Sequence, residues 1–263
     1  MDLERISCCT IPLRDKGSEY TFGVIAQAGY KKVDLLGRMP HFDPNDPTYD
    51  FEAVMALAER YGLRIANIGS YCGGDFVSDD ETARERALAE TIAVIDAAAL
   101  CGARSIRTRP GLPEDVAMID RMVPYYQRAA EYAAQKGVYM GIENHGGPIS
   151  GNPELLVELF EKVGSPHFGV LYEPCNLATA GADYKRAFHV MCDHIVHVHV
   201  KDTYLVDGKM RVVWLGTGAI DYRWVVANVE SLGYEGEYAL EYEVHDEPPE
   251  TGVGKWLDWF EKI

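Results

Sequence analysis

The sequence of 263 residues lacks both long hydrophobic runs and clusters of basic residues. A membrane-spanning helix needs about 20 consecutive apolar residues, and no stretch of the chain approaches that length. The 25 Lys and Arg residues are outnumbered by 41 Asp and Glu residues, which gives a formal net charge of −16. Nucleic acids and anionic membranes attract proteins through basic surfaces, so this charge balance argues against both kinds of partner.

Several motifs that mark other protein classes are also missing. None of the six cysteines belongs to a CxxC pair, so we expect free thiols in a cytoplasmic protein. The acidic and polar residues 1–5 are unlike the start of a secretory signal peptide. No GxGxxG motif follows the first predicted strand and no GxSxG motif occurs, which argues against a dinucleotide-binding fold and against a serine hydrolase.

The chain instead shows a regular alternation of short β-branched or aromatic segments with longer amphipathic segments. The short segments predict eight strands, at or near residues 6–11, 32–36, 63–68, 105–108, 138–143, 168–173, 195–200 and 239–241. A helix is predicted after each strand, and segment 203–219 is predicted to be a long loop. Eight such units favour a single (β/α)8 TIM barrel domain over residues 1–263, with an open doubly wound sheet as the alternative.

Four predicted strands end with side chains that are common metal ligands. These residues are Glu143, Glu173, His199 and Glu241, on the fifth to eighth strands. Active sites of such barrels form at the carboxyl ends of the strands, so neighbouring strands can bring these four residues together. The alternative is that each residue is an independent charge or a hydrogen-bonded group at the rim of the barrel.

A shared ion would solve an electrostatic problem at this predicted cluster. Two carboxylates about 4 Å apart repel each other by about 4 kcal/mol at an effective dielectric constant of about 20. In addition, a buried carboxylate without a partner costs free energy because it has lost its hydration. One divalent cation would remove both costs. Three carboxylates and one imidazole suit a hard ion, so we expect Mn²⁺, with Mg²⁺, Co²⁺ and Zn²⁺ as alternatives.

Further polar residues near the strand ends fit either substrate binding or a structural role. His197 faces the same way as His199 but lies one layer deeper, where a hydrogen-bonded core histidine is expected. Lys201 continues this face and would reach the substrate, or it is an outward charge at the rim. His145 would contact substrate hydroxyls or act as a base, or it belongs to the glycine turn that follows it. Asn176 would turn its amide to the site or cap a turn.

Two more segments bear on whether the substrate is anionic. Arg107 and Arg109 end the fourth strand, where one of them, predicted to be Arg107, would bind an anionic substrate group. Ion pairing within an acidic barrel explains these arginines equally well. Segment 215–221 resembles a phosphate-binding loop at the position usual for such barrels, but a glycine turn with Asp221 as a helix cap is the alternative.

These motifs together resemble the sugar phosphate isomerase/epimerase family of the xylose isomerase-like TIM barrel superfamily. The matching segments are Ile-Glu143-Asn-His, Tyr-Glu173-Pro-Cys-Asn, His-Val-His199-Val-Lys-Asp, Leu-Glu241-Tyr-Glu and Gly216-x-Gly218-x-x-Asp221. The sequence departs from the ketose epimerases of the family at Asn176 and Leu205, where those proteins carry His and Arg. It also departs at Ile149, where they carry a second Glu. The substrate contacts are therefore expected to differ from those of these epimerases.

The resemblance implies a metal-dependent isomerase or epimerase of a small keto-sugar or related ketone. The metal would stabilise an enediolate, while Glu143 and Glu241 remove and return the proton next to the carbonyl. The residues predicted to bind the sugar are His145, Asn176, Lys201 and Arg107. The alternatives are a lyase, dehydrating or β-eliminating, that uses the same site on a keto-sugar or keto-inositol, and a non-catalytic sugar-binding barrel. We also expect a homo-oligomer located in the cytoplasm.

Overall fold

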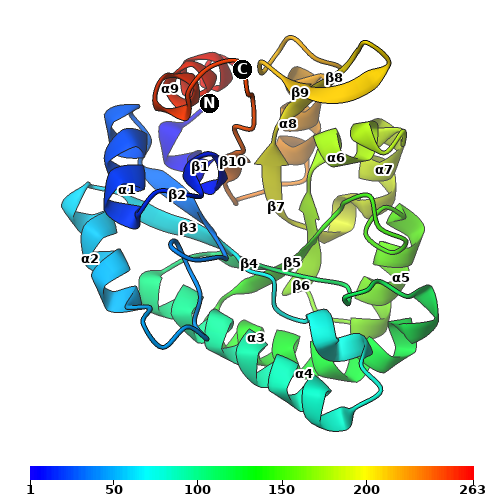
Figure 1. The fold of residues 1–263 in the computed structure, drawn as a ribbon. Helices are drawn as coiled ribbons and strands as arrows, with labels where there is room; N and C mark the ends of the chain where they lie inside the picture. Colours follow the sequence, from blue (N-terminus) through cyan, green and yellow to red (C-terminus); the bar gives the residue numbers. More distant parts are fainter.

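Eight parallel strands close into a barrel in the computed structural model, which describes residues 1–263 (Figure 1). The order around the barrel is β1-β10-β7-β6-β5-β4-β3-β2, so barrel strands that are consecutive along the chain are neighbours in space. The strands are β1 (Ile6–Cys9), β2 (Lys32–Leu36), β3 (Arg64–Gly69), β4 (Ser105–Thr108), β5 (Tyr139–Glu143), β6 (Phe168–Tyr172), β7 (Ile195–Val200) and β10 (Tyr238–Leu240). This closure confirms the predicted barrel and excludes the open doubly wound sheet.

Helices form the outer layer around the strands (Figure 1). They are α1 (Ser18–Gln27), α2 (Phe51–Arg60), α3 (Glu81–Cys101), α4 (Ile119–Lys136), α5 (Pro153–Val163), α6 (Pro174–Thr179), α7 (Tyr184–Met191), α8 (Tyr222–Ser231) and α9 (Pro249–Phe260). Short 3-10 segments lie between them at Leu3–Arg5, Ile11–Leu13, Gly74–Val77, Val116–Met118 and Cys192–His194. None of the helices combines the length and the apolar character needed to cross a membrane.

The ends of several helices follow from residues that the sequence places there. Asp50 begins α2, and its carboxylate accepts a hydrogen bond of 2.9 Å from the backbone N–H three residues later. Asn152 begins α5 in the same way and is followed by proline at the first helical position. Gly102 and Gly137 end α3 and α4 with φ of 72°, a left-handed conformation that favours glycine.

The segment after β7 differs from its prediction as a loop. Asp202–Val206 (β8) and Lys209–Val213 (β9) pair as an antiparallel hairpin outside the barrel. Asp207 and Gly208 form its turn with φ of 50° and 74°, a conformation that an Asp-Gly pair favours. Helix α6 was not predicted either, because six residues are too few to show a helical period.

A network of buried polar side chains crosses the interior of the barrel. The Ser105 hydroxyl donates a hydrogen bond of 2.8 Å to Asn67 Oδ1, and Asn67 Nδ2 donates one of 2.8 Å to Asp34 Oδ1. The second carboxylate oxygen of Asp34 lies 2.9 Å from His197 Nε2. Buried polar groups cost free energy unless they are hydrogen-bonded, so these contacts fix the side chains of β2, β3, β4 and β7 relative to one another.

Candidate functional site

The four residues predicted to bind a metal come together at the carboxyl ends of four strands. Glu143 is the last residue of β5, Glu173 follows β6, His199 lies near the end of β7, and Glu241 follows β10. One nitrogen or oxygen atom from each residue lies within 4.8 Å of the corresponding atoms of the other three. The predicted convergence is therefore present, and the alternative of four independent rim charges does not describe this arrangement.

Two polar atoms at this point of convergence have no hydrogen-bond partner within the protein. Glu173 Oε2 and His199 Nδ1 are both buried and accept or donate no hydrogen bond. His199 Nδ1 lies 3.7 Å from Glu143 Oε1 and 3.8 Å from Glu241 Oε1. An unsatisfied buried polar atom is costly, and a cation bound between these atoms would satisfy all of them at once. The donor set of three carboxylates and one imidazole fits a divalent ion.

The local sequence after β6 holds Glu173 in place. Its Oε1 accepts a hydrogen bond of 2.9 Å from the backbone N–H of Cys175 at the start of α6, and Pro174 occupies the first helical position. The side chain of Asn144 hydrogen-bonds both the N–H and the C=O of Glu173. Burial, assisted by the charge of Glu241, raises the pKa of Glu173 to about 8 despite the opposing charge of Lys201. Oε1 of Glu173 is thus held by a hydrogen bond, while its Oε2 has no hydrogen-bond partner.

Asp34 on β2 orients the imidazole of His199 from behind. Asp34 Oδ2 lies 3.2 Å from His199 Nε2 and 2.9 Å from His197 Nε2, so Nδ1 of His199 faces the carboxylates. Burial disfavours the Asp34 anion, but the two histidines outweigh burial and hold the pKa of Asp34 well below its ordinary value. Burial also opposes the charge on His199, yet Asp34 and the neighbouring glutamates raise the pKa of His199 to about 9. The prediction that His197 is a hydrogen-bonded core residue is confirmed, whereas Asp34 was not predicted as a site residue.

Arg107 and Asn176, two predicted substrate contacts, both bind Glu143. Arg107 Nη1 lies 2.6 Å from Glu143 Oε2, and Asn176 Nδ2 donates a hydrogen bond of 3.1 Å to Glu143 Oε1. Burial would raise the pKa of Glu143, but the charges of Arg107 and His199 lower it to about 2. Glu143 is therefore held as an anion near neutral pH. These contacts favour the ion-pairing interpretation of Arg107 over direct substrate binding.

Lys201 pairs with Glu241 as Arg107 pairs with Glu143. Its ammonium group is buried and forms ion pairs with Glu241 Oε2 and, at 3.0 Å, with Glu243 Oε2. Burial disfavours this charge, but Glu241, Glu173 and Glu243 hold the pKa of Lys201 well above its ordinary value. Lys201 is thus not an outward rim charge. Glu243 was not predicted, although it lies two residues after Glu241 and so extends from the same side of the chain.

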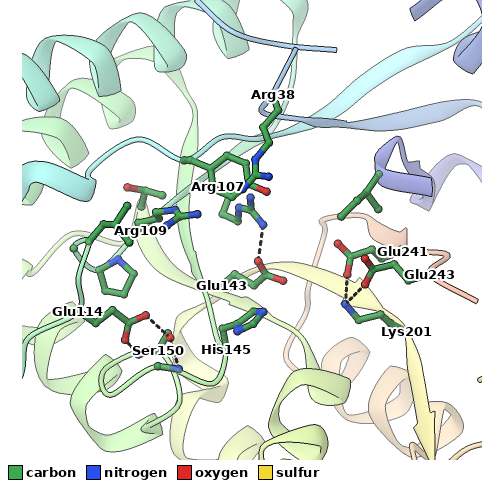
Figure 2. A pocket seen from close by; sticks show the side chains of 17 residues that line it. Arg38, Arg107, Arg109, Glu114, Glu143, His145, Ser150, Lys201, Glu241 and Glu243 are labelled. Atoms are coloured by element: carbon green, nitrogen blue, oxygen red, sulfur yellow. Dashed lines mark hydrogen bonds and ion pairs between the residues drawn. The ribbon is translucent and has the colours of Figure 1, made fainter. Parts of the chain in front are cut away.

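A cavity of about 460 Å³ opens over this centre and is lined by Glu143, His145, Lys201, Glu241 and Arg107, among others. Figure 2 shows Lys201 and Glu241 on one side of the cavity and arginines on the other, with Glu143 and His145 between them. The imidazole of His145 is exposed, and its Nδ1 accepts a hydrogen bond of 2.9 Å from the next backbone N–H. This volume is within the range of small-molecule sites.

The predicted phosphate-binding segment 215–221 already holds an anion of the protein itself. Backbone N–H groups of Gly216 and Gly218 donate to Asp202 Oδ2 at 3.0 and 2.9 Å, and that of Ile220 donates to Oδ1 at 3.1 Å. These donors are occupied, so the structure favours the turn over the phosphate hypothesis. Asp221 caps α8, as the alternative predicted.

Comparison with known proteins agrees with the barrel fold. A family model described as xylose isomerase-like TIM barrel matches residues 22–263. The chain belongs to the xylose isomerase-like TIM barrel family. Among solved structures, a xylose isomerase-like TIM barrel protein from Mycobacterium smegmatis in complex with magnesium superposes with a TM-score of 0.82 at 16% identity, covering 100% of this chain and 97% of that chain.

Two curated relatives of this xylose isomerase-like protein have named activities. Inosose dehydratase of Geobacillus thermodenitrificans is 26% identical over 139 residues, which are 47% of this chain and 47% of that protein. L-ribulose-5-phosphate 3-epimerase UlaE of Escherichia coli O157:H7 is 26% identical over 134 residues, which are 51% of this chain and 46% of that protein. The chain thus spans about half the length of these relatives.

Proposed function

We propose that this protein is a divalent-metal-dependent isomerase or epimerase of a small keto-sugar or related ketone. The observation that supports this proposal is the convergence of four donor residues within 4.8 Å, of which Glu173 and His199 each have a buried atom, Oε2 and Nδ1, without a hydrogen-bond partner. The named relatives, an epimerase of L-ribulose 5-phosphate and a dehydratase of inosose, support a sugar or cyclitol ketone as substrate.

The residues that would hold the ion are Glu143, Glu173, His199 and Glu241. Mn²⁺ is the ion we propose, with Mg²⁺, Co²⁺ and Zn²⁺ as alternatives for this donor set. Such an ion supplies a Lewis acid that polarises a carbonyl oxygen and makes the neighbouring C–H more acidic. Glu173 and His199 are buried below the cavity, whereas Glu143 and Glu241 line it.

The proposed proton transfer uses Glu143 and Glu241 on two sides of the substrate. They belong to the ends of β5 and β10, which are separated around the barrel by β6 and β7. One carboxylate would remove the proton next to the carbonyl, and the other would return a proton to the resulting planar carbon. Arg107 and Lys201 each bind one oxygen of these carboxylates and so fix their orientation. Among the predicted sugar contacts, His145 and Lys201 line the cavity and would bind substrate hydroxyls, while Asn176 acts through Glu143.

A lyase is the second candidate, and the inosose dehydratase relative favours it. The first step, removal of the proton next to the carbonyl, would be the same. The outcomes differ because a dehydratase expels the β-hydroxyl as water, whereas an isomerase or epimerase leaves the mass of the substrate unchanged. Mass spectrometry of the products from a set of keto-sugars and inososes therefore distinguishes the two.

The proposal is tested by metal analysis and by exchange of the substrate α proton in deuterium oxide. Gently purified protein should contain one divalent ion per chain, and a screen of keto-sugars should identify one whose α proton exchanges. Glu143→Gln and Glu241→Gln should each reduce this exchange by at least about 100-fold, because each removes a proton-transfer group. The control Glu131→Gln alters an exposed carboxylate on α4 and should leave exchange unchanged. Exchange at the wild-type rate in both site variants would contradict the assignment.

A further inference from the structure

Three arginines surround one tyrosine ring at the edge of the cavity. The guanidinium carbons of Arg38, Arg107 and Arg109 lie 4.5, 4.2 and 4.5 Å from the centroid of the Tyr71 ring. Arg38 follows β2, Tyr71 follows β3, and the other two arginines belong to the end of β4. Guanidinium groups stack on aromatic faces, so the tyrosine holds the three charges within a small region.

Only one of these arginines is neutralised by contacts within the protein. Arg107 Nη1 pairs with Glu143, while its Nε and Nη2 donate to the carbonyls of Ser70 and Gly69. The guanidinium groups of Arg38 and Arg109 form no hydrogen bond and no ion pair, although both line the cavity. Arg38 is exposed and Arg109 is half-buried, so the N–H groups of both side chains remain available to a ligand in the cavity.

The charges of this group repel one another. Burial, followed by the nearby charges of Arg107 and Arg38, lowers the pKa of Arg109 even though Glu114 acts in the opposite direction. Glu114 also lines the cavity but is bound elsewhere, since its oxygens accept hydrogen bonds of 2.8, 2.9 and 2.6 Å from the backbone of residue 149 and from the backbone and hydroxyl of Ser150. An external anion between Arg38 and Arg109 would relieve this repulsion and use their free donors.

The position of these arginines complements the candidate metal centre. Figure 2 shows Arg38 and Arg109 across the cavity from Glu241 and Lys201. A substrate whose carbonyl lies at Glu143 and Glu241 would therefore extend its other end toward the arginines. The usual barrel position for a phosphate is closed here, because the amides after Trp214 bind Asp202 instead.

We propose that Arg38 and Arg109, stacked on Tyr71, bind an anionic group of the substrate, either a phosphate or a carboxylate, at the end remote from the carbonyl. The placement of the carbonyl rests on the function proposed above, whereas the anion site rests on the free arginines themselves. Two guanidinium groups present paired N–H donors that match the oxygens of either anion. Arg107 is a positioning residue for Glu143 and lies next to this site.

The first experiment measures anion binding without metal and without turnover. Inorganic phosphate and acetate are titrated separately into chelator-treated protein and followed by calorimetry, and the stronger ligand identifies the class of anion. Arg38→Gln and Arg109→Gln should each weaken binding about tenfold, the loss expected for one charge-assisted contact. Arg223→Gln removes an exposed arginine of α8 that does not line the cavity, and it should leave binding unchanged. Failure of the wild type to bind either anion, or binding as tight as that of the wild type in both site variants, would overturn the proposal.

The second experiment uses the substrate found in the exchange screen and compares it with its neutral analogue. Arg38→Gln and Arg109→Gln should raise KM for the anionic compound about tenfold with little change in kcat, and Arg109→Lys should restore part of the loss. KM for the neutral analogue should not change. An equal rise for both compounds would overturn the proposal, because it would indicate a general structural effect. A protein that binds phosphate through these arginines but exchanges no α proton would contradict the proposed function and leave the anion site intact.

Discussion

At the scale of single residues, Asp34 decides which nitrogen of His199 faces the candidate metal centre. One oxygen of Asp34 contacts Nε2 of His197 and of His199, which leaves Nδ1 of His199 directed at Glu143 and Glu241. A carboxylate behind a histidine ligand fixes its ring and increases its basicity. Asp34 lies inside a buried strand, and that is the one sequence signal that could have identified it.

Replacement of Asp34 tests this role. We expect Asp34→Asn to weaken Mn²⁺ binding about 10- to 100-fold, as is typical when the partner of a histidine ligand is lost. Calorimetric titration of chelator-treated protein with Mn²⁺ measures this change. Asp15→Asn, at an exposed position, is the matched control. An unchanged Mn²⁺ affinity in a folded Asp34→Asn variant would show that Asp34 has no part in the site.

The burial of Glu173 predicts how the stability of the metal-free protein depends on pH. The pKa of Glu173 is about 8 in the folded chain and near the ordinary 4.5 in the unfolded chain. Between these values the folded state holds a proton that the unfolded state has lost, so the free energy of unfolding falls as the pH rises toward 8. His199, with a raised pKa of about 9, acts in the same direction between pH 6.5 and 9.

We therefore expect chelator-treated protein to be less stable in urea at pH 8 than at pH 6. Glu173→Gln removes one of the two titrating groups and should make this difference smaller. Glu131→Gln, on the exposed surface of α4, should show the same difference in stability between pH 6 and pH 8 as the wild type. The same pH dependence in Glu173→Gln and in the wild type would contradict a raised pKa at this position.

At the scale of structural elements, the turn between β9 and α8 is built around a carboxylate of β8. Asp202 accepts hydrogen bonds from the backbone N–H groups of Gly216, Gly218 and Ile220. A Cβ atom at Gly218 would lie 2.1 Å from Asp202 Oδ1 and 2.6 Å from the carbonyl oxygen of Thr203. The glycine is therefore required for the close approach of the hairpin and the turn.

Gly218→Ala should consequently destabilise the protein by about 1–3 kcal/mol, because the turn must move away and leave the Asp202 carboxylate less well hydrogen-bonded. Urea unfolding measures the loss. Gly17→Ala is the control, since a Cβ there meets no atom within 4 Å and φ is −64°. Equal stability of the two variants would mean that the turn does not depend on this contact.

At the scale of the whole molecule, the two ends of the chain close the barrel together. Strand β1 pairs with β2 on one side and with β10 on the other. Figure 1 shows the N- and C-termini close together beside α9. Phe260 of α9 is fully buried and packs with ring centroids 5.7 Å from Tyr238 of β10 and 6.2 Å from Tyr222 of α8. The last helix thus covers the strand that completes the closure.

Truncation of this side chain should weaken the whole barrel. We expect Phe260→Ala to reduce the free energy of unfolding by about 3–5 kcal/mol, the usual loss for a buried phenylalanine. Leu232→Ala, at a position that is 43% exposed, should change it by no more than about 0.5 kcal/mol. Both values come from urea unfolding at one pH. A small loss in Phe260→Ala would show that α9 contributes little to closure.

The sequence by itself determined the barrel, the approximate positions of its strands and the four converging candidate ligand residues. Barrel strands that follow one another along the chain are neighbours, so a side chain at the end of a strand has its place in the site fixed by chain order alone. For this reason Glu143, Glu173, His199 and Glu241 could be identified from apolar segments and the residues that end them. The same reasoning identified His197 as a buried residue one layer below.

Only the tertiary structure decided which charges are paired and which remain free. Asp34 meets His199 across the barrel, Arg107 turns to Glu143, and Asp202 fills a turn that resembles a phosphate site. None of these partners is near the other in sequence, and the choice between them depends on distances of a few ångströms that no periodicity encodes. Arg38 and Arg109 were left unpaired by the same packing, because the carboxylates around them already have other partners.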